Sequence, residues 1–170
     1  MREVLRHDGI PWHNHLDPQP ETIVGDLHWT DYTVTVDAQI PVDSYALLLG
    51  RISVVPQNDK LPNGYAFKIA GNGEWELRAI RTTVGPKPWD FKTTGDTGAP
   101  LIQGHADFAA NSWHHLELGM KGDEISVRSD GKILAMVHDS THSHGQVGLG
   151  SGWPGADITK FSVSPNSLSK

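Results

Sequence analysis

The residues best suited to chemistry in this 170-residue chain are two carboxylates, Glu74 and Glu76, which stand on either side of Trp75. On an extended strand, residues i and i+2 project from the same face, so these carboxyl groups would lie about 7 Å apart. Inverting glycoside hydrolases hold their acid and base roughly 6.5–9.5 Å apart. The pair is therefore compatible with a small glycoside hydrolase or lyase. An ordinary solvated strand face also carries such pairs, and Ala79 stands where the Glu-x-Asp-x-x-Glu run of β-sandwich glucanases has its second Glu.

Histidine is the second residue type that could do chemistry, with ten copies in the chain. His138 and His142 have the His-x-x-x-His spacing that suits zinc when a helix places both rings on one face, and His144 follows closely. The residues between them have turn composition, so we expect a solvated loop instead of a metal site. His114 and His115 are adjacent on an expected strand and point to opposite faces, so they cannot share a ligand.

The composition excludes several function classes. Fourteen Lys and Arg against twenty Asp and Glu leave a net charge of −6, which argues against nucleic acid as a partner. Cysteine is absent, which excludes disulfides, cysteine-ligated zinc and cysteine nucleophiles. No apolar run approaches the roughly 20 residues of a membrane helix, so we expect no membrane span. Residues 1–8 also lack the apolar segment of a signal peptide.

Alternating patterns predict the strands that must position these side chains. From Tyr32 to Ile40, apolar and polar residues alternate, as they do in a strand with one buried face. Asp130-Gly131 suits a type I′ turn between two strands, because both turn residues must take positive φ. No long window has helical spacing, so the pattern predicts an all-β antiparallel sandwich or barrel. Similar alternation predicts eight further strands, at residues 45–55, 65–69, 75–80, 113–120, 124–129, 132–138, 146–149 and 158–163.

Two stretches do not alternate, at residues 8–20 and 85–104. Loops of this length in a compact domain are usually functional or mobile. We therefore expect three parts. Residues 1–24 form an irregular segment that packs on the sandwich, residues 25–164 form the sandwich, and residues 165–170 form a tail.

Several motifs carry a resemblance to a known family. Gly-Asp-Leu-His-Trp-Thr-Asp-Tyr-Thr-Val-Thr-Val-Asp, which begins at Gly25, resembles the strand entry of the C-terminal lectin-like domain of galactocerebrosidases, glycoside hydrolase family 59. The order and spacing of the motifs extend the resemblance over residues 2–163. The other motifs are Tyr-Ala-Leu-Leu-Leu-Gly-Arg at 45–51, Gly-Glu-Trp-Glu-Leu at 73–77, Ser-Trp-His-His-Leu-Glu-Leu at 112–118 and Gly-Gln-Val-Gly-Leu-Gly-Ser at 145–151.

The resemblance implies a two-sheet jelly-roll sandwich, concanavalin A-like or laminin-G-like, that binds carbohydrate without catalysis. Family members join it to a (β/α)₈ barrel that hydrolyses β-galactosides of sphingolipids, and no catalytic residue is carried over to this sequence. It also implies a glycan or glycolipid headgroup as ligand, a glycoside hydrolase catalytic domain as partner, and a secreted or extracytoplasmic location. The family's calcium site uses an Asp where this chain has Thr159, so we predict no cofactor and no metal.

Sugar binding in such a fold needs flat aromatic faces and planar polar groups. Trp89, Asp90 and Trp153 lie in loops and are the predicted carbohydrate contacts, together with Arg51 and Arg78, whose guanidinium groups could bind vicinal hydroxyls. Two alternatives stay open: a hydrolase or lyase that uses Glu74 and Glu76, and a structural domain that packs on a partner enzyme. Three other tryptophans are expected to pack in the sheets: Trp29, Trp75 and Trp113.

Overall fold

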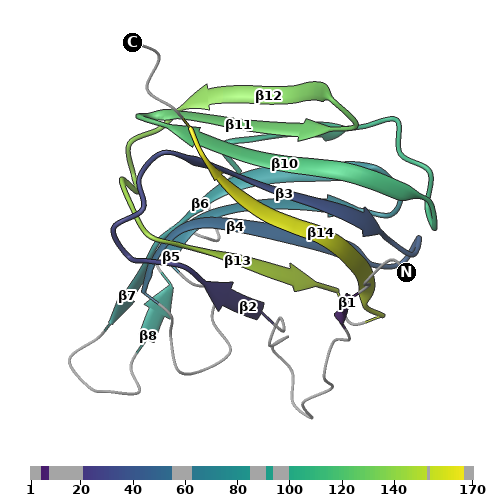
Figure 1. Cartoon of the computed structure of the whole chain (residues 1–170), viewed down its shortest axis with the longest axis horizontal. Coiled ribbons are helices and arrows are strands. Elements are labelled where there is room, and N and C mark those ends of the chain that lie inside the picture. Colours follow the sequence, from purple (N-terminus) through teal and green to yellow (C-terminus); the bar gives the residue numbers. More distant parts are fainter. Residues whose placement is uncertain are drawn as a thin grey trace.

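The computed structural model contains two antiparallel sheets of six strands each and a separate pair of short strands (Figure 1). The structure describes residues 5–7, 21–54, 63–84, 91–93, 100–152 and 154–166. Within these ranges there is no helix, and therefore none that is long and apolar enough to cross a membrane. The prediction of an all-β, two-sheet antiparallel fold is confirmed.

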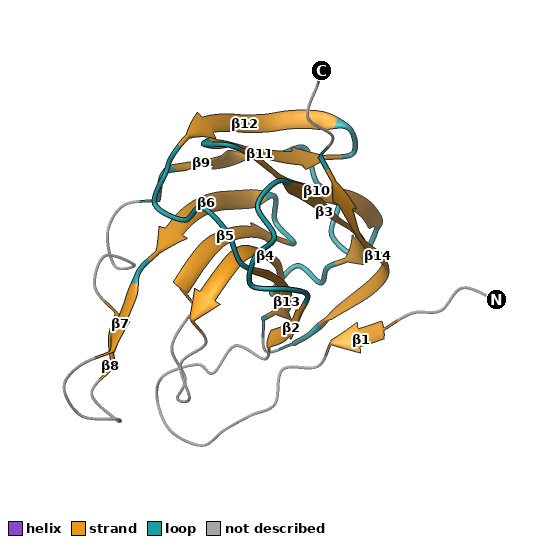
Figure 2. Cartoon of the chain, turned by 60° about the vertical axis from the view of Figure 1, so that its left-hand side comes forward, coloured by secondary structure: helices purple, strands orange, loops and turns teal. Residues whose placement is uncertain are grey.

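The strands of both sheets curve around one interior (Figure 2). Sheet A contains, in spatial order, β1 (Leu5–His7), β14 (Ala156–Pro165), β3 (Tyr32–Gln39), β10 (Trp113–Lys121), β11 (Glu124–Ser129) and β12 (Lys132–His138). Sheet B contains, in spatial order, β2 (Glu21–Val24), β13 (Gln146–Ser151), β4 (Tyr45–Val54), β5 (Asn63–Ala70), β6 (Glu74–Ile80) and β9 (Ile102–His105). The separate pair consists of β7 (Thr82–Val84) and β8 (Phe91–Thr93).

The core lies between the two sheets and follows the alternation read from the sequence. Every second residue of a strand points inward, and burying each large apolar side chain contributes about 1.5–3 kcal/mol. This burial decides which face of each strand is left for function. Fully buried core residues include Val34, Val36, Leu116 and Leu118 from sheet A and Leu48, Phe67, Ile69 and Leu77 from sheet B.

Sheet B has a second apolar cluster on its outer face, facing away from the core. The cluster residues alternate along β4 and β5 with residues of the main core, so these strands are apolar on both faces. Further along the same outer face, β5 and β6 carry the charged residues Lys68, Glu74, Glu76 and Arg78. The outer face of sheet B therefore has an apolar part, formed by this cluster, and a charged part on β5 and β6. The cluster comprises Leu47, Leu49, Ile52, Ala66 and Ile80.

All nine strands expected from alternation are present, and five short strands were not expected. β1 pairs with β14 and β2 pairs with β13, so the segment 1–24 is not wholly irregular. Likewise β8 and most of β9 lie in the stretch 85–104 that was predicted to be a loop. Strands of three or four residues are too short for alternation to reveal them. The whole stretch 8–20 lies outside the described residues, as do residues 1–4 and residues 167–170 of the predicted tail.

The expected type I′ turn joins β11 to β12. Asp130 has a φ of 51° and Gly131 a φ of 76°, the two positive values that this turn requires. The turn brings β12 alongside β11, where β12 is an edge strand of sheet A.

Candidate functional site

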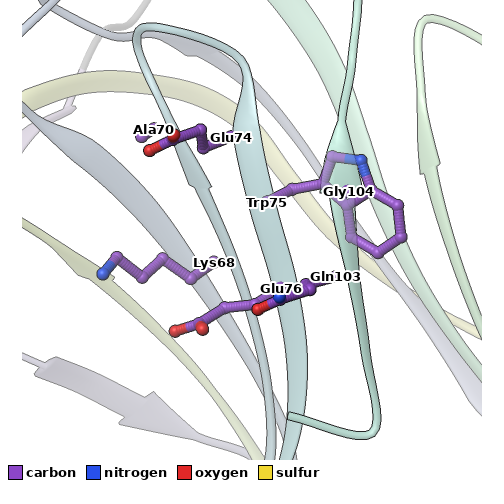
Figure 3. A pocket seen from close by; sticks show the side chains of 7 residues that line it. All are labelled: Lys68, Ala70, Glu74, Trp75, Glu76, Gln103 and Gly104. Carbon is purple, nitrogen blue, oxygen red and sulfur yellow. The ribbon is translucent and has the colours of Figure 1, made fainter.

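A cleft of about 470 Å³ opens where β5, β6 and β9 lie side by side in sheet B (Figure 3). Ligand sites commonly have volumes of about 300–1,000 Å³, so a small ligand fits this cleft. We call it the sheet B cleft. Its lining includes Lys68, Ala70, Glu74, Trp75, Glu76, Gln103 and Gly104.

Three polar side chains form one row across the cleft. Lys68 pairs directly with Glu76, and Glu76 pairs directly with Gln103 on the other side. Directly paired residues of antiparallel strands have Cβ atoms about 4.5–5.5 Å apart on the same face. Lys68, Glu74 and Glu76 extend to the same side in Figure 3, whereas the indole of Trp75 extends to the other. The row therefore combines an ammonium, a carboxylate and an amide, which together donate to and accept from hydroxyl groups.

An ion pair within β6 orients the central carboxylate of this row. Arg78 Nη2 donates to Glu76 Oε2 at 2.9 Å, and both side chains are about one-quarter exposed. The two residues are two positions apart, so they project from the same face of the strand. The fold thus brings together three of the residues singled out from the sequence: Glu74, Glu76 and Arg78.

The edge strand β9 reaches the cleft because Gly104 lies over a tryptophan. Trp75 is 7% exposed and belongs to the core, as expected. A Cβ atom at Gly104 would lie only 2.8 Å from Cζ2 of that indole. A residue with a side chain would push β9 away, and Gln103 would leave its place beside Glu76.

Arg51 lies outside the cleft and is held by the fold. Its side chain is 1% exposed, and its guanidinium donates to the backbone carbonyls of Thr30 and His142, both at 2.9 Å. Its Nη2 also lies 3.3 Å from Asp31 Oδ1. Arg51 has a φ of 50° and stands where the pairing of β4 with β5 shifts register. This placement does not favour the contact with sugar hydroxyls that was predicted for Arg51. Alternation in the sequence does not reveal a register shift between two strands.

Three predicted carbohydrate contacts, Trp89, Asp90 and Trp153, lie outside the described residues and stay predictions. Sequence reasoning missed Lys68 and Gln103. Lys68 could have been found, because it occupies an outward position of the expected strand 65–69. Gln103 could not, because it belongs to the short strand β9 in a stretch that reads as a loop.

The histidines that suggested a metal site have different partners. His138 Nδ1 lies 3.3 Å from Asp123 Oδ1, and His144 Nδ1 lies 2.8 Å from the Leu27 carbonyl oxygen. His142 is buried edge-on against a tyrosine ring. Thr159, at the position of the family's calcium-binding Asp, is a buried residue of β14. In the part of the chain that the structure describes, no three His, Cys, Asp or Glu side chains are grouped to hold a metal ion, and the absence of a cofactor stays a prediction.

A family model described as the C-terminal lectin domain of galactocerebrosidase matches residues 1–165 of the chain. The chain belongs to this galactocerebrosidase lectin-domain family. Mouse galactocerebrosidase is 28% identical to this lectin domain over 156 residues, a match that covers 89% of the chain and 20% of the mouse protein. The lectin domain thus spans about a fifth of the length of that curated relative. The resemblance read from the sequence motifs is confirmed.

Solved structures with the same fold include carbohydrate-binding proteins. The carbohydrate-binding module CBM66 of Bacillus subtilis aligns with a TM-score of 0.56 and 17% identity, over 79% of this lectin domain and 75% of the module. The exoplasmic/lumenal domain of VIP36, in its Ca²⁺/Man₃GlcNAc-bound form, aligns with a TM-score of 0.58 and 13% identity, over 99% and 85% of the two chains. These similarities show that the lectin domain has the sandwich fold of lectins and carbohydrate-binding modules.

Proposed function

We propose that this lectin domain binds a carbohydrate in the sheet B cleft without cleaving it. The observation that carries the proposal is the row of Lys68, Glu76 and Gln103 in a cleft of about 470 Å³. The fold shared with CBM66 and with glycan-bound VIP36 supports the same function. We further propose that the domain serves a glycoside hydrolase catalytic domain, because the match covers only 20% of the mouse galactocerebrosidase.

The side chains of the row suggest how a sugar is held. The Glu76 carboxylate accepts hydrogen bonds from hydroxyl groups, while the Lys68 ammonium and the Gln103 amide donate them. A hydrogen bond to a charged group contributes about 1.5–3 kcal/mol, so Lys68 and Glu76 should supply most of the polar affinity. Arg78 does not line the cleft, and it acts by holding the Glu76 carboxylate in place.

The second candidate function is a hydrolase or lyase, and the placement of Glu74 and Glu76 in one cleft favours it. The surroundings of Glu74 oppose it, because its side chain is exposed to water. Glycosidases usually obtain their general acid from a carboxyl group in an apolar pocket. We therefore place binding ahead of catalysis at this site.

The test is calorimetric titration of the purified domain with methyl β-D-galactopyranoside, preceded by a screen on an array of neutral glycans. We expect Glu76→Gln to weaken binding at least tenfold, about 1.4 kcal/mol, and to lower the free energy of unfolding by less than about 1 kcal/mol, because its ion pair is part-exposed. Asp43→Asn removes the same charge from an exposed turn outside the cleft and should bind like the wild type.

Three results would overturn this proposal in different ways. Wild-type protein that binds no glycan would favour the structural reading, in which the domain only packs on a partner enzyme. Equal binding by wild type and Glu76→Gln would move the site elsewhere. Hydrolysis of p-nitrophenyl β-D-galactopyranoside that Glu76→Gln abolishes would establish the hydrolase.

A further inference from the structure

The outer face of sheet A contains a second hollow, of about 440 Å³, on the opposite side of the sandwich from the sheet B cleft. Its floor is Gly119 on β10, which pairs directly with Thr33 on β3 and with Ser126 on β11. A Cβ atom at Gly119 would lie 2.6 Å from Ser126 Oγ. The missing side chain therefore creates the hollow. Glycine inside a strand costs about 0.5–1 kcal/mol and often marks a place where a ligand or another backbone approaches closely.

The charges around this hollow are balanced. Glu117 pairs directly with Arg128 across β10 and β11, and Lys121 pairs directly with Glu124 on the other side of Gly119. All four side chains line the hollow, so its two cations and two carboxylates carry no net charge. Such a site suits an uncharged polar ligand better than a phosphate or a carboxylate.

Two polar side chains of the hollow are available to a ligand. Among the residues that the structure describes, the side chains of Ser126 and Arg128 have no hydrogen-bond or ion-pair partner. Arg128 is half-buried, and its planar guanidinium carries five N–H donors. By contrast, the Thr33 hydroxyl donates to Asn166 Oδ1 at 2.8 Å, so the fold already uses it.

Two exposed apolar side chains flank the polar floor. Ile133 and Met136 on β12 are 53% and 48% exposed. They pair directly with Arg128 and Ser126, respectively, so they lie on the same face of sheet A as the hollow. A sugar ring presents hydroxyl groups on its edge and C–H groups on its face. Hydroxyls could bind at Arg128 and Ser126 while the C–H face contacts Ile133 and Met136.

We propose that this hollow is a second saccharide-binding site, specific for neutral sugars and independent of the sheet B cleft. The two sites share no residue and lie on opposite outer faces, so one domain could hold two glycan chains at once. Bivalent attachment to a surface that carries many copies of a glycan can raise apparent affinity by about 10²–10⁴ without a new contact.

The test is NMR titration of ¹⁵N-labelled full chain with the methyl glycosides of galactose, glucose and mannose, each at millimolar concentration. We expect at least one glycoside to shift the amide signals of Gly119, Ser126 and Arg128. Arg128→Met should weaken that binding at least tenfold and leave shifts at the sheet B cleft unchanged. Glu76→Gln should do the reverse. Lys132→Met removes a cation from β12 outside the hollow and should change neither set of shifts.

Absence of shifts at Gly119 with all three glycosides would overturn the second site, whatever happens in the sheet B cleft. Shifts at Gly119 that persist unchanged in Arg128→Met would also overturn it. Signals of Ile133 and Met136 that move with protein concentration in the absence of sugar would identify the face as a contact between protein copies and refute the proposal. Because the two sites have separate reporter residues, failure of one is distinguishable from failure of the other.

Discussion

Arg51 on β4 and Arg78 on β6 belong to the same sheet and were candidates for the same role, yet the fold uses them differently. The side chain of Arg51 is 1% exposed and donates to two backbone carbonyls. The side chain of Arg78 is 27% exposed, and its guanidinium donates to the Glu76 carboxylate beside the sheet B cleft. Backbone carbonyls are fixed by the fold, whereas a carboxylate at a cleft can also bind a ligand. Burial and the kind of partner therefore separate a structural arginine from one that serves a site.

The surroundings of Arg51 form a buried polar network at one end of the sandwich. The Arg51 N–H donates to the Tyr32 hydroxyl at 2.6 Å. The Tyr65 hydroxyl donates to Asp139 Oδ1 at 2.6 Å and accepts from the His142 N–H at 3.3 Å. Burial raises the pKa of both phenols to about 12, so both remain protonated donors at any working pH. The network attaches the connection between β12 and β13 to both sheets.

The largest expected effect comes from Arg51→Met. Removing one partner from a buried charged network leaves the others unpaired, so we expect the free energy of unfolding to fall by about 3–5 kcal/mol. Urea unfolding measures this change. Arg78→Met is the matched control and should cost less than about 1 kcal/mol, because its ion pair is part-exposed. Equal losses in the two variants would break the distinction between these arginines.

A smaller effect is expected on ligand affinity in Arg78→Met. Without Arg78 the Glu76 carboxylate loses the donor that orients it, so methyl β-D-galactopyranoside should bind at least threefold more weakly, roughly 0.7 kcal/mol. Calorimetric titration measures the change. Arg81→Met is a suitable control, because Arg81 is exposed and bonds to Thr141 instead of to the cleft. Unchanged affinity in Arg78→Met would mean that Glu76 does not need its ion pair.

A still smaller effect concerns pH and the Arg51 network. Burial lowers the pKa of His142 from 6.5, and Arg81 and Arg51 lower it further, against a bond to the Ile80 backbone and the charge of Asp139. The unfolded chain then binds the proton more readily than the folded chain. Stability from His142 is therefore full above about pH 6.5 and falls as the pH drops toward the folded pKa. The pKa of the Asp139 carboxyl is also lowered, but from 3.8. Its protonation therefore reduces stability only at a much more acidic pH, as the pH falls below about 3.8.

Urea unfolding between about pH 7.5 and 5.5 measures this loss of stability. His142→Leu should reduce the slope of the unfolding free energy against pH. His138→Leu is the control, because His138 is exposed and should leave the slope unchanged. An identical slope in wild type and His142→Leu would show that His142 does not couple the network to pH.

The smallest expected effect is that of metal removal. The described residues offer no group of three metal-ligating side chains, so we expect EDTA to leave the melting temperature unchanged. A metal bound only by the folded chain would stabilise it by mass action, so its removal would lower the melting temperature. A loss of stability with EDTA that calcium restores would contradict the prediction.

The sequence by itself determined most strands and much of the sheet B cleft. Period-two alternation depends only on neighbouring residues, so it revealed nine strands and placed Glu74 and Glu76 on one face. The turn at Asp130-Gly131 followed from the positive φ that both residues accept. Family motifs spread along the chain identified the lectin-like sandwich, and the family match confirms it.

The tertiary structure decided which of these faces became sites. Gln103 reaches Glu76 only because β9 pairs with β6, and that pairing joins segments separated by a stretch without alternation. Arg51 is buried because β4 shifts register at that point. The side chain therefore points to the opposite face of the sheet from the one that alternation predicts. The hollow at Gly119 depends on the neighbours that β3 and β11 supply. Strand pairing and register depend on contacts between distant segments, and local alternation carries no record of them.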